Sequence, residues 1–304
     1  MSNPEIDALR AEMAARVRPT ELADMRAGLD ARGLAYGIAD DVQVDVVSAA
    51  GVPAEWTFTP NADPRRVILY FHGGGYVVGS LDSHRHVAAE IGRAAATRVL
   101  ALGYRLAPEH PFPAPIEDAL AAYRYLLASG FAASNIALAG DSAGGGLAVA
   151  AMVAIRDAGL PQPACGWTIS PWIDMENTGG SITSKSAEDP NVQKPGLDMM
   201  ATTYLAGGDK RNPLASPLHA DMRGLAPLLV QVGAAETLLD DGIRLAAIAG
   251  AAHVAVTMEV WPEMIHVWHL HHPRLAAGRK SIANGGAFVQ ASMDGVAPVT
   301  PRVG

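Results

Sequence analysis

The stretch NIALAGDSAGGGLAVAAMVAI, residues 135–155, decides the fold. Its first six residues form a short apolar run that predicts a buried strand, and the part from residue 143 onward has the pattern of a helix. Residues 140–144, Gly-Asp-Ser-Ala-Gly, lie between the two and match the G-x-S-x-G nucleophile elbow in its strand–turn–helix context. A turn this tight needs small neighbours, because a Cβ at position 140 or 144 would collide with the surrounding chain. The pattern therefore predicts that the Ser142 hydroxyl stands above the sheet as a nucleophile.

Glycine-rich turns also serve other chemistry. A phosphate-binding loop would follow G-x-x-x-x-G-K-[ST] and a dinucleotide-binding turn G-x-G-x-x-G, and the glycines here follow neither pattern. For the pentapeptide taken alone, a serine in an ordinary tight turn is the plain alternative. The rest of the sequence argues against that alternative.

A second motif, ILYFHGGGYVVGS at residues 68–80, places His72 and three glycines directly after a predicted strand. Glycines let backbone N–H groups approach a substrate oxygen on which negative charge develops. With the N–H of Ala143, the run Gly73, Gly74, Gly75 is expected to form an oxyanion hole. His72 is interpreted as a hydrogen-bonding group that orients this loop and not as a proton carrier, because the motif acts through its backbone.

The composition limits the partners. The chain of 304 residues is 49% hydrophobic and 18% charged, which is typical of a globular protein with a large core. Its formal net charge of −8 argues against nucleic acid and anionic membranes as partners and favours a small neutral substrate. The single cysteine, Cys165, excludes an internal disulfide framework and fits a reducing compartment. Neither a signal sequence nor an apolar run long enough to cross a bilayer is evident, so we expect a cytoplasmic protein without stable membrane association.

Strand-like and helical patterns alternate along the chain, which predicts an α/β fold with a mainly parallel sheet covered on both faces. Helices are predicted in the segments 114–129 and 142–159, and Gly130 and Gly159 close them as glycines suited to a helix end. The predicted strands are VQVDVV (42–47), AEWTFTP (54–60), RVILYFHG (66–73), RVLALGYR (98–105), NIALAGD (135–141), CGWTIS (165–170), LLVQVG (228–233) and VAVTMEVW (254–261).

Two segments fall outside this alternation. Residues 3–33 have an amphipathic, helical pattern before any strand, and residues 177–218 form a long insertion. Loops of that length inside a compact domain are typical of lids or binding elements.

Taken together, the motifs resemble those of the hormone-sensitive lipase-like family of bacterial esterases. After HGGG come YRLAPEHPFPAPIEDALAAYRYL (104–126), GDSAGGGLA, SPWID and NPLASPL in the family's order, so that the match runs from about Val67 to Trp268. The resemblance implies an α/β-hydrolase fold with an eight-stranded sheet, one domain over residues 1–304. It also implies a helical cap formed by about residues 1–45 and an insertion at about 177–215.

The resemblance further implies a Ser-His-acid triad, no metal or organic cofactor, and oxyanion donors from Gly74, Gly75 and Ala143. It also suggests a homodimer. Asp141 belongs to the elbow motif as a structural residue, and Glu109, His110 and Asp118 match family positions that we interpret as scaffolding.

The base of the triad is sought after the last strand, because the order along the chain in this fold is serine, acid, histidine. Of the ten histidines, His266 lies just beyond the strand 254–261, where the family motif has its base. His269, His271 and His272 are expected on the following helix as a surface or packing group. A metal site there is disfavoured, because no H-E-x-x-H or carboxylate–histidine spacing completes a coordination shell.

The acid departs from the commoner family pattern. Many relatives have D-x-L-x-D-[DE]-G after the seventh strand, whereas ETLLDDG here places Glu236 at the first aspartate. Asp240 is the alternative acid, but Asp240 and Asp241 are also explained by the start of a helix, where acids interact with exposed N–H groups and the helix dipole. This fold uses either aspartate or glutamate as the acid, and Glu236 stands at the position of the family's first aspartate. We therefore expect Glu236 to be the triad member.

These residues predict a carboxylic-ester hydrolase that acts on small, neutral, hydrophobic esters of short to medium acyl chain through an acyl-enzyme. A lactonase or an amidase with the same triad remains an alternative. A non-catalytic, ligand-binding member of the fold would be expected to lack the serine or the histidine, and both are present.

Overall fold

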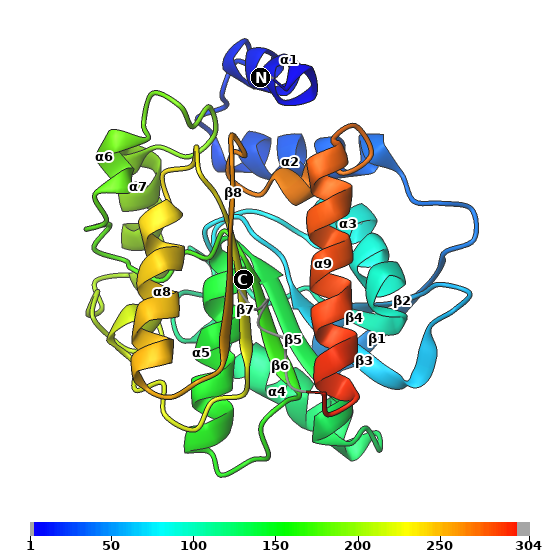
Figure 1. Cartoon of the computed structure of the whole chain (residues 1–304). Helices are drawn as coiled ribbons and strands as arrows, with labels where there is room; N and C mark the ends of the chain where they lie inside the picture. The colour runs from blue at the N-terminus through cyan, green and yellow to red at the C-terminus, as the bar shows by residue number, and fades with distance from the viewer. Residues whose placement is uncertain (1–2, 297–304) are drawn as a thin grey trace, which may run out of the picture.

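The computed structural model describes residues 3–296 and has the alternating order of strands and helices that the sequence predicts (Figure 1). All eight predicted strands are confirmed. The strands are β1 (Gln43–Ala49), β2 (Val52–Phe58), β3 (Asp63–Phe71), β4 (Thr97–Leu102), β5 (Ile136–Asp141), β6 (Cys165–Ile169), β7 (Leu228–Gly233) and β8 (Val256–Trp261). The helices are α1 (Pro4–Ala14), α2 (Leu22–Tyr36), α3 (Leu81–Ala95), α4 (Ala114–Ala128), α5 (Ala143–Asp157), α6 (Ser181–Ser184), α7 (Lys194–Leu205), α8 (Leu239–Ala251) and α9 (Ala276–Met293), with 3-10 turns η1 (Ala133–Asn135), η2 (Pro217–His219) and η3 (Trp268–His271).

The strands form one eight-stranded sheet in the order β1-β2-β4-β3-β5-β6-β7-β8. β2 is antiparallel to both of its neighbours, and every pair from β4 to β8 is parallel. The carboxyl ends of β3, β5, β6, β7 and β8 therefore meet along one edge of the sheet, which is where ligands bind in folds of this class.

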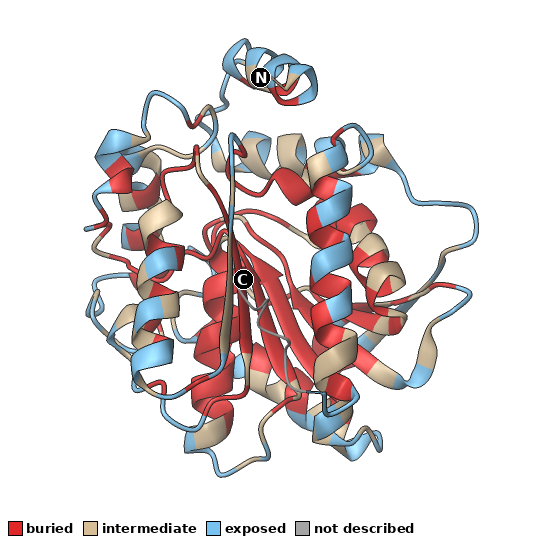
Figure 2. Ribbon diagram, in the orientation of Figure 1, coloured by how far each residue is buried: buried red, intermediate tan, exposed pale blue. Residues whose placement is uncertain are grey.

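Helices cover both faces of the sheet. α3 and α9 pack on one face through apolar residues such as Ile91 and Val289, and α4, α5 and α8 pack on the other through residues such as Tyr123 and Leu245. The edge strands β1 and β8 are partly exposed, whereas β4, β5, β6 and β7 and the helix α5 are almost wholly buried (Figure 2). This burial explains why the strands read as continuous apolar runs.

The elbow between β5 and α5 has the strained geometry that its sequence predicts. Ser142 has φ 54° and ψ −121°, in a region that residues with a side chain rarely adopt. A Cβ at Gly140 would lie 2.3 Å from the carbonyl oxygen of Gly144, and one at Gly144 would lie 2.0 Å from that of Phe71. The expected steric need for glycine at both positions is confirmed.

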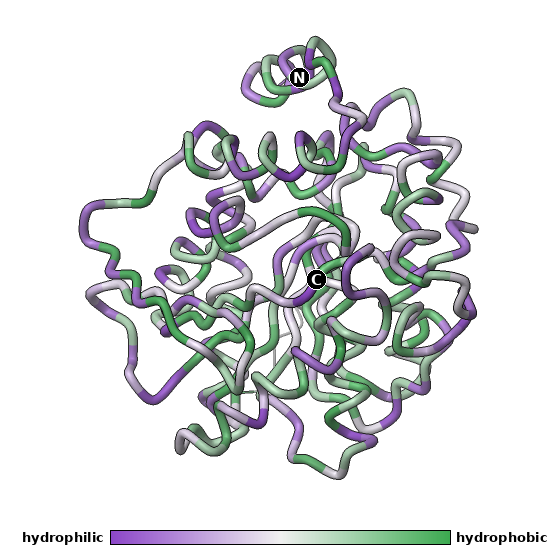
Figure 3. The backbone as a smooth tube through the Cα atoms, turned by 180° about the vertical axis from the view of Figure 1, so that it is seen from behind, coloured by the Kyte–Doolittle hydropathy of each residue, from purple (hydrophilic) through white to green (hydrophobic). Residues whose placement is uncertain are grey.

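The two segments outside the alternation lie above the carboxyl edge of the sheet (Figure 1). α1 packs against Met264, Ile265, Trp268 and Leu275. Met25 of α2 and Met200 of α7 belong to one apolar cluster with Val77, Val78 and Ala107, which follow β3 and β4. Hydrophobic and hydrophilic residues alternate along α1 and α2, as seen from behind in Figure 3. Across residues 3–296, no helix combines the length and the apolar character that spanning a bilayer demands.

We expect Gly140→Ala to lower the free energy of unfolding by about 1–3 kcal/mol or more, because the added methyl group overlaps backbone that cannot move freely. Gly250→Ala is the matched control, since Gly250 is exposed on α8 and a Cβ there meets nothing within 4 Å. That control should gain about 0.5–1 kcal/mol from the helix preference for alanine. Chemical denaturation of both variants measures the difference; equal stabilities would contradict the packing argument.

Candidate active site

Consecutive parallel strands bring the polar groups of the candidate site to one edge of the sheet. Ser142 follows β5, Ser170 follows β6, Glu236 lies in the turn after β7, and His266 lies in the loop after β8. The structure thus brings together the three residues that the sequence assigned to a triad, and it adds Ser170.

His266 is oriented toward the serine. Its Nε2 lies 2.9 Å from Ser142 Oγ, and the imidazole is buried while Ser142 is half-buried. Burial lowers the pKa of His266 below its usual value, and the negative charges of Asp189 and Asp141 partly offset that effect. The neutral imidazole, which can accept a proton, is therefore the prevailing form at neutral pH.

Glu236 is fully buried on the other side of the imidazole. Its Oε2 lies 3.8 Å from His266 Nδ1 and accepts a 2.7 Å hydrogen bond from the Ser170 hydroxyl. The Ser170 oxygen also accepts a 3.1 Å bond from the N–H of Val267, the residue after His266. Burial raises the pKa of the Glu236 carboxyl, and the Ser170 hydroxyl opposes that rise. Ser170 was not singled out from the sequence, although it begins the SPWID motif.

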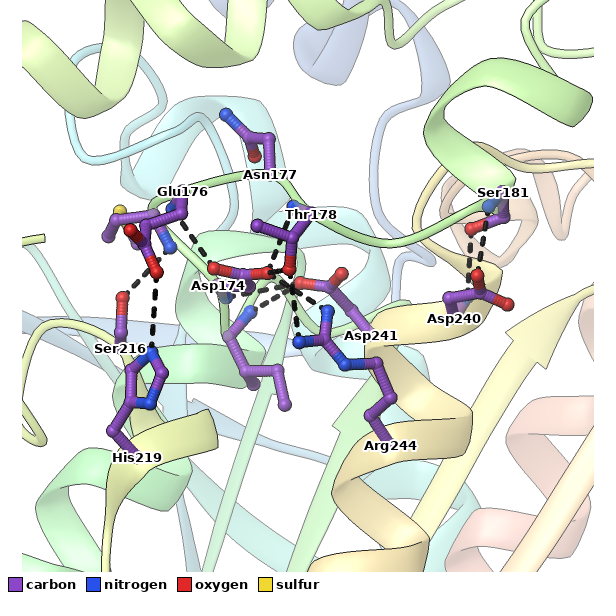
Figure 4. Close-up of polar contacts among 12 residues, drawn as sticks. Asp174, Glu176, Asn177, Thr178, Ser181, Ser216, His219, Asp240, Asp241 and Arg244 are labelled. Carbon is purple, nitrogen blue, oxygen red and sulfur yellow. Dashed lines mark hydrogen bonds and ion pairs between the residues drawn. The ribbon is translucent and has the colours of Figure 1, made fainter. Parts of the chain in front are cut away.

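Asp240 and Asp241 lie in the first turn of α8, as the sequence predicts, but their carboxylates bind the loop after β6 and not their own helix (Figure 4). Asp240 Oδ2 accepts a 2.9 Å bond from the N–H of Ser181. Asp241 Oδ2 accepts bonds of 2.9 and 3.2 Å from the N–H groups of Ile173 and Asp174. Burial raises the pKa of Asp241 to about 7. These contacts leave Glu236 as the acid that faces His266.

The glycine loop after β3 has backbone conformations that favour glycine. Gly74 and Gly75 have φ of 119° and 62°, and a Cβ at Gly74 would lie 2.1 Å from the carbonyl oxygen of Val78. Gly73 requires a correction to the expected oxyanion hole. Its N–H donates a 3.0 Å bond to Asp141 Oδ1, so this N–H is not directed at a substrate oxygen. Within residues 3–296, the N–H groups of Gly74 and Gly75 have no acceptor in the surrounding backbone or side chains.

Asp141 and His72 lie beneath this loop. The Tyr70 hydroxyl donates a 2.6 Å bond to Asp141 Oδ1, and His84 Nε2 lies 3.4 Å from Asp141 Oδ2. Burial alone would raise the pKa of Asp141, but His84 and Tyr70 hold it below its usual value. His72 stacks on Tyr104 with 4.3 Å between ring centroids, and burial lowers the pKa of its imidazole to about 4. Both residues contact the backbone and side chains of the loop, consistent with the structural roles expected for them.

The remaining histidines near His266 pack inside the protein. His269 Nε2 lies 3.0 Å from Gln231 Oε1, and His271 Nδ1 lies 2.7 Å from the Tyr36 hydroxyl. His272 stacks on His86. His269 and His271 are buried on η3. Of the two positions expected for these histidines, packing inside the protein agrees with the structure and a place on the surface does not.

One group of side chains in the described part of the chain has the spacing of a cation site: Asp174, Glu176 and His219 offer ligand atoms within 4.8 Å of one another (Figure 4). However, Asp174 Oδ2 already accepts bonds from Arg244 and Thr178, and Glu176 is paired with Arg211 at 2.8 Å. Two guanidinium groups therefore neutralise these carboxylates. Glu109 and Asp118 are likewise paired, with Arg26 and Arg105.

Met200 of α7 lies directly over the glycine loop. A Cβ at Gly75 would lie 2.1 Å from Met200 Sδ. Tyr204, one turn further along α7, stacks on Tyr76 with 3.9 Å between ring centroids. Apolar and aromatic side chains of the insertion therefore border the site.

A serine on a strained strand-to-helix turn, with a histidine from a later loop at hydrogen-bond distance and a glycine loop beside it, defines a serine hydrolase of the α/β-hydrolase fold. Comparisons with known proteins agree. Residues 68–270 match the family model described as alpha/beta hydrolase fold. The chain is 47% identical over 292 residues to an acetyl-hydrolase of Streptomyces hygroscopicus, a match that covers 95% of this chain and 97% of that relative.

Solved structures give the same result. The chain is similar to the crystal structure of an esterase from the bacterial hormone-sensitive lipase family, with a TM-score of 0.94 and 50% identity over 96% of this chain and 99% of that one. It is also similar to the esterase EstE5, in a crystal soaked with p-nitrophenyl butyrate, with a TM-score of 0.93 and 45% identity over 96% and 100% of the two chains. The chain belongs to the hormone-sensitive lipase-like esterases of the α/β-hydrolase fold and is a carboxylesterase. The family, fold and enzyme class expected from the sequence are confirmed.

The geometry around His266 predicts unequal effects of its two candidate acids. Glu236→Gln should lower kcat by roughly 10³- to 10⁴-fold, because an amide cannot stabilise the imidazolium and favours the wrong imidazole tautomer. Asp240→Asn should change kcat little, since its carboxylate binds Ser181. Steady-state kinetics of the two variants, with thermal melts to verify folding, make the comparison; a severe loss confined to Asp240→Asn would reverse the assignment.

Proposed function

We propose that the protein hydrolyses small, neutral carboxylic esters with short- to medium-chain acyl groups, through a triad of Ser142, His266 and Glu236 and an acyl-enzyme intermediate. The observation that carries the proposal is the 2.9 Å approach of His266 Nε2 to Ser142 Oγ on the strained elbow. That arrangement sets a general base beside the hydroxyl of a half-buried serine, as acyl transfer requires.

In the proposed first step, Ser142 Oγ attacks the ester carbonyl carbon while His266 Nε2 takes the hydroxyl proton. The negative charge that forms on the carbonyl oxygen is stabilised by the N–H groups of Gly74, Gly75 and Ala143, which need not reorganise during the reaction. Glu236 stabilises the imidazolium of His266. His266 then gives its proton to the leaving alkoxide as the C–O bond breaks.

The second step releases the acid. Water attacks the acyl carbon of the ester on Ser142, His266 takes a proton from that water, and Ser142 leaves with the proton returned by His266. A lactone or an amide would follow the same steps, so these substrates belong in the same assay as competitors of simple esters.

The substrate class is supported by the surroundings of the site. Met200 contacts the glycine loop at Gly75, and α2 contributes Leu22, Met25 and Leu29 to the apolar cluster beside it. Side chains of this kind favour a neutral, apolar acyl group of limited length. The similarity to an acetyl-hydrolase supports a short acyl chain. We propose accordingly that about residues 1–45 and 177–215 act as a cap over the site.

Ser142→Ala should lower kcat by roughly 10⁵- to 10⁶-fold on p-nitrophenyl acetate, because it removes the nucleophile. The variant should melt near the wild-type temperature and should not react with an organophosphate that phosphorylates active serines. More than a few per cent of wild-type activity in the purified variant would contradict the assignment of the nucleophile.

Acyl-chain length should depend on Met200. We expect wild-type kcat/KM to be highest for acyl chains of about two to eight carbons, and Met200→Ala to raise kcat/KM for longer chains relative to acetyl by about tenfold, since several atoms over the glycine loop are removed. Met199→Ala is the matched control, because Met199 precedes it on α7 and is 44% exposed. A wild-type preference for palmitoyl esters, or equal chain-length profiles for the two variants, would overturn this view of the pocket.

A further inference from the structure

A buried carboxylate of the insertion binds the loop that carries Glu236. Asp189 is 2% exposed, and its Oδ2 accepts hydrogen bonds of 2.9 Å from the N–H of Thr237 and 3.2 Å from the Thr237 hydroxyl. Thr237 directly follows Glu236 and is itself fully buried. The insertion therefore holds the backbone one residue beyond the proposed triad acid.

The loop around Asp189 is ordered independently of Thr237. Asp189 Oδ1 accepts bonds of 2.9 and 3.0 Å from the N–H groups of Asn191 and Val192, and the Asp189 carbonyl accepts a 2.7 Å bond from Gln193 Nε2. Arg18, between α1 and α2, donates to the carbonyl oxygens of Pro190 and Asn191. The carboxylate is thus held in a fixed position next to Thr237. Little conformational entropy is therefore lost when the two residues make their contact.

The insertion holds Thr237 from a second side as well. The Ser181 hydroxyl donates a 2.7 Å bond to the Thr237 carbonyl. It also accepts a 2.9 Å bond from the N–H of Asp240 (Figure 4). By contrast, the Glu236 carboxylate is 3.8 Å from His266 Nδ1, beyond hydrogen-bond distance. The orientation of Glu236 toward His266 therefore depends on the hydrogen bond from Ser170 and on how firmly residues 237–240 are held.

Resting on the triad proposed above, we propose that Asp189 is a positioning residue of the active site, which ties the insertion to the Glu236 loop and places its negative charge at Thr237, the residue after Glu236. Both oxygens of Asp189 accept from N–H groups, so a neutral amide at this position would keep only part of these hydrogen bonds and would also lose the charge. The pH profile, which responds to the charge, separates the proposal from a merely structural role.

The charge acts on both members of the pair. The Glu236 carboxylate lies 3.8 Å from His266 Nδ1. The charges of Asp189 and Asp141 also act on His266, and those of Asp189 and Asp241 act on Glu236. The Asp189 charge raises the pKa of His266, whereas burial lowers it. The Asp189 charge also raises the pKa of Glu236, and burial acts on that pKa in the same direction. The nearest cations of this loop, Arg18 and Lys185, bind carbonyl oxygens and Glu188. Removing the Asp189 charge therefore lowers both pKa values.

Asp189→Asn tests the proposal. With p-nitrophenyl acetate, we expect kcat to fall about 10- to 100-fold with KM changed less than about threefold, because the acid is displaced and the imidazolium loses a stabilising charge. The acidic limb of the kcat/KM profile should move to lower pH. Asp198→Asn is the matched control, since Asp198 lies on α7, is half-exposed and pairs with Lys194, and it should match the wild type in both readouts.

Wild-type kcat in Asp189→Asn, a loss shared by Asp198→Asn, or a loss with an unmoved acidic limb would each overturn the proposal. If Asp189→Asn does not fold, Thr237→Val decides, because it removes only the Thr237 hydroxyl, which contacts Asp189 Oδ2 at 3.2 Å and the Val192 carbonyl oxygen at 3.3 Å. We expect it to lower kcat about three- to tenfold at unchanged KM, and wild-type kcat would overturn the proposal. Glu236→Gln distinguishes a failure of the proposed triad from a failure of the role of Asp189. Full activity in Glu236→Gln would contradict the triad. An inactive Glu236→Gln together with a normal Asp189→Asn would contradict only the role of Asp189.

Discussion

The rest of the structure depends on the close approach of β3, β5 and α5 at the elbow. Backbone atoms of Phe71, Gly140 and Gly144 leave no room for a Cβ at positions 140 and 144, and the chain between them places Ser142 at φ 54°. Such a conformation costs on the order of 1–3 kcal/mol and persists only where the surroundings enforce it. Here the buried sheet and α5 enforce it, so the large apolar core is what keeps the serine hydroxyl raised above the strands.

The parallel strands bring the residues of the site together. Because β5 to β8 are neighbours in the sheet and run in the same direction, residues far apart in the sequence meet at one edge without any direct connection. The sheet fixes where each loop begins, but the last few ångströms depend on hydrogen bonds between loops. Ser170 joins the turn after β7 to the loop after β8, and Asp189 and Ser181 join that same turn to the insertion. The site is therefore a network of loops supported by a rigid base.

The sequence predicted the strands, the elbow and the order serine, acid, histidine, because each leaves a local signal: apolar runs, glycine at fixed positions, and position after a strand. It did not predict Ser170 or Asp189, whose contacts join residues distant in the sequence. It also assigned Gly73 to the oxyanion hole, since nothing local reveals that Asp141 takes up the N–H of Gly73. From the sequence, Asp240 could be either the triad acid or a residue at the start of a helix. Only its contact with Ser181 in the structure decided between the two.

The packing of α1 has a consequence for how the protein is made. Residues 4–14 leave the ribosome early, but their apolar face is covered by Met264, Ile265, Trp268 and Leu275, which are synthesised long afterwards. Until then Ile6, Leu9 and Met13 have no partner, and exposed apolar surface of this kind promotes association between nascent chains. A contact of such long range also slows folding. The helix is thus translated long before the residues that cover it, and it can reach its place only after they have been made.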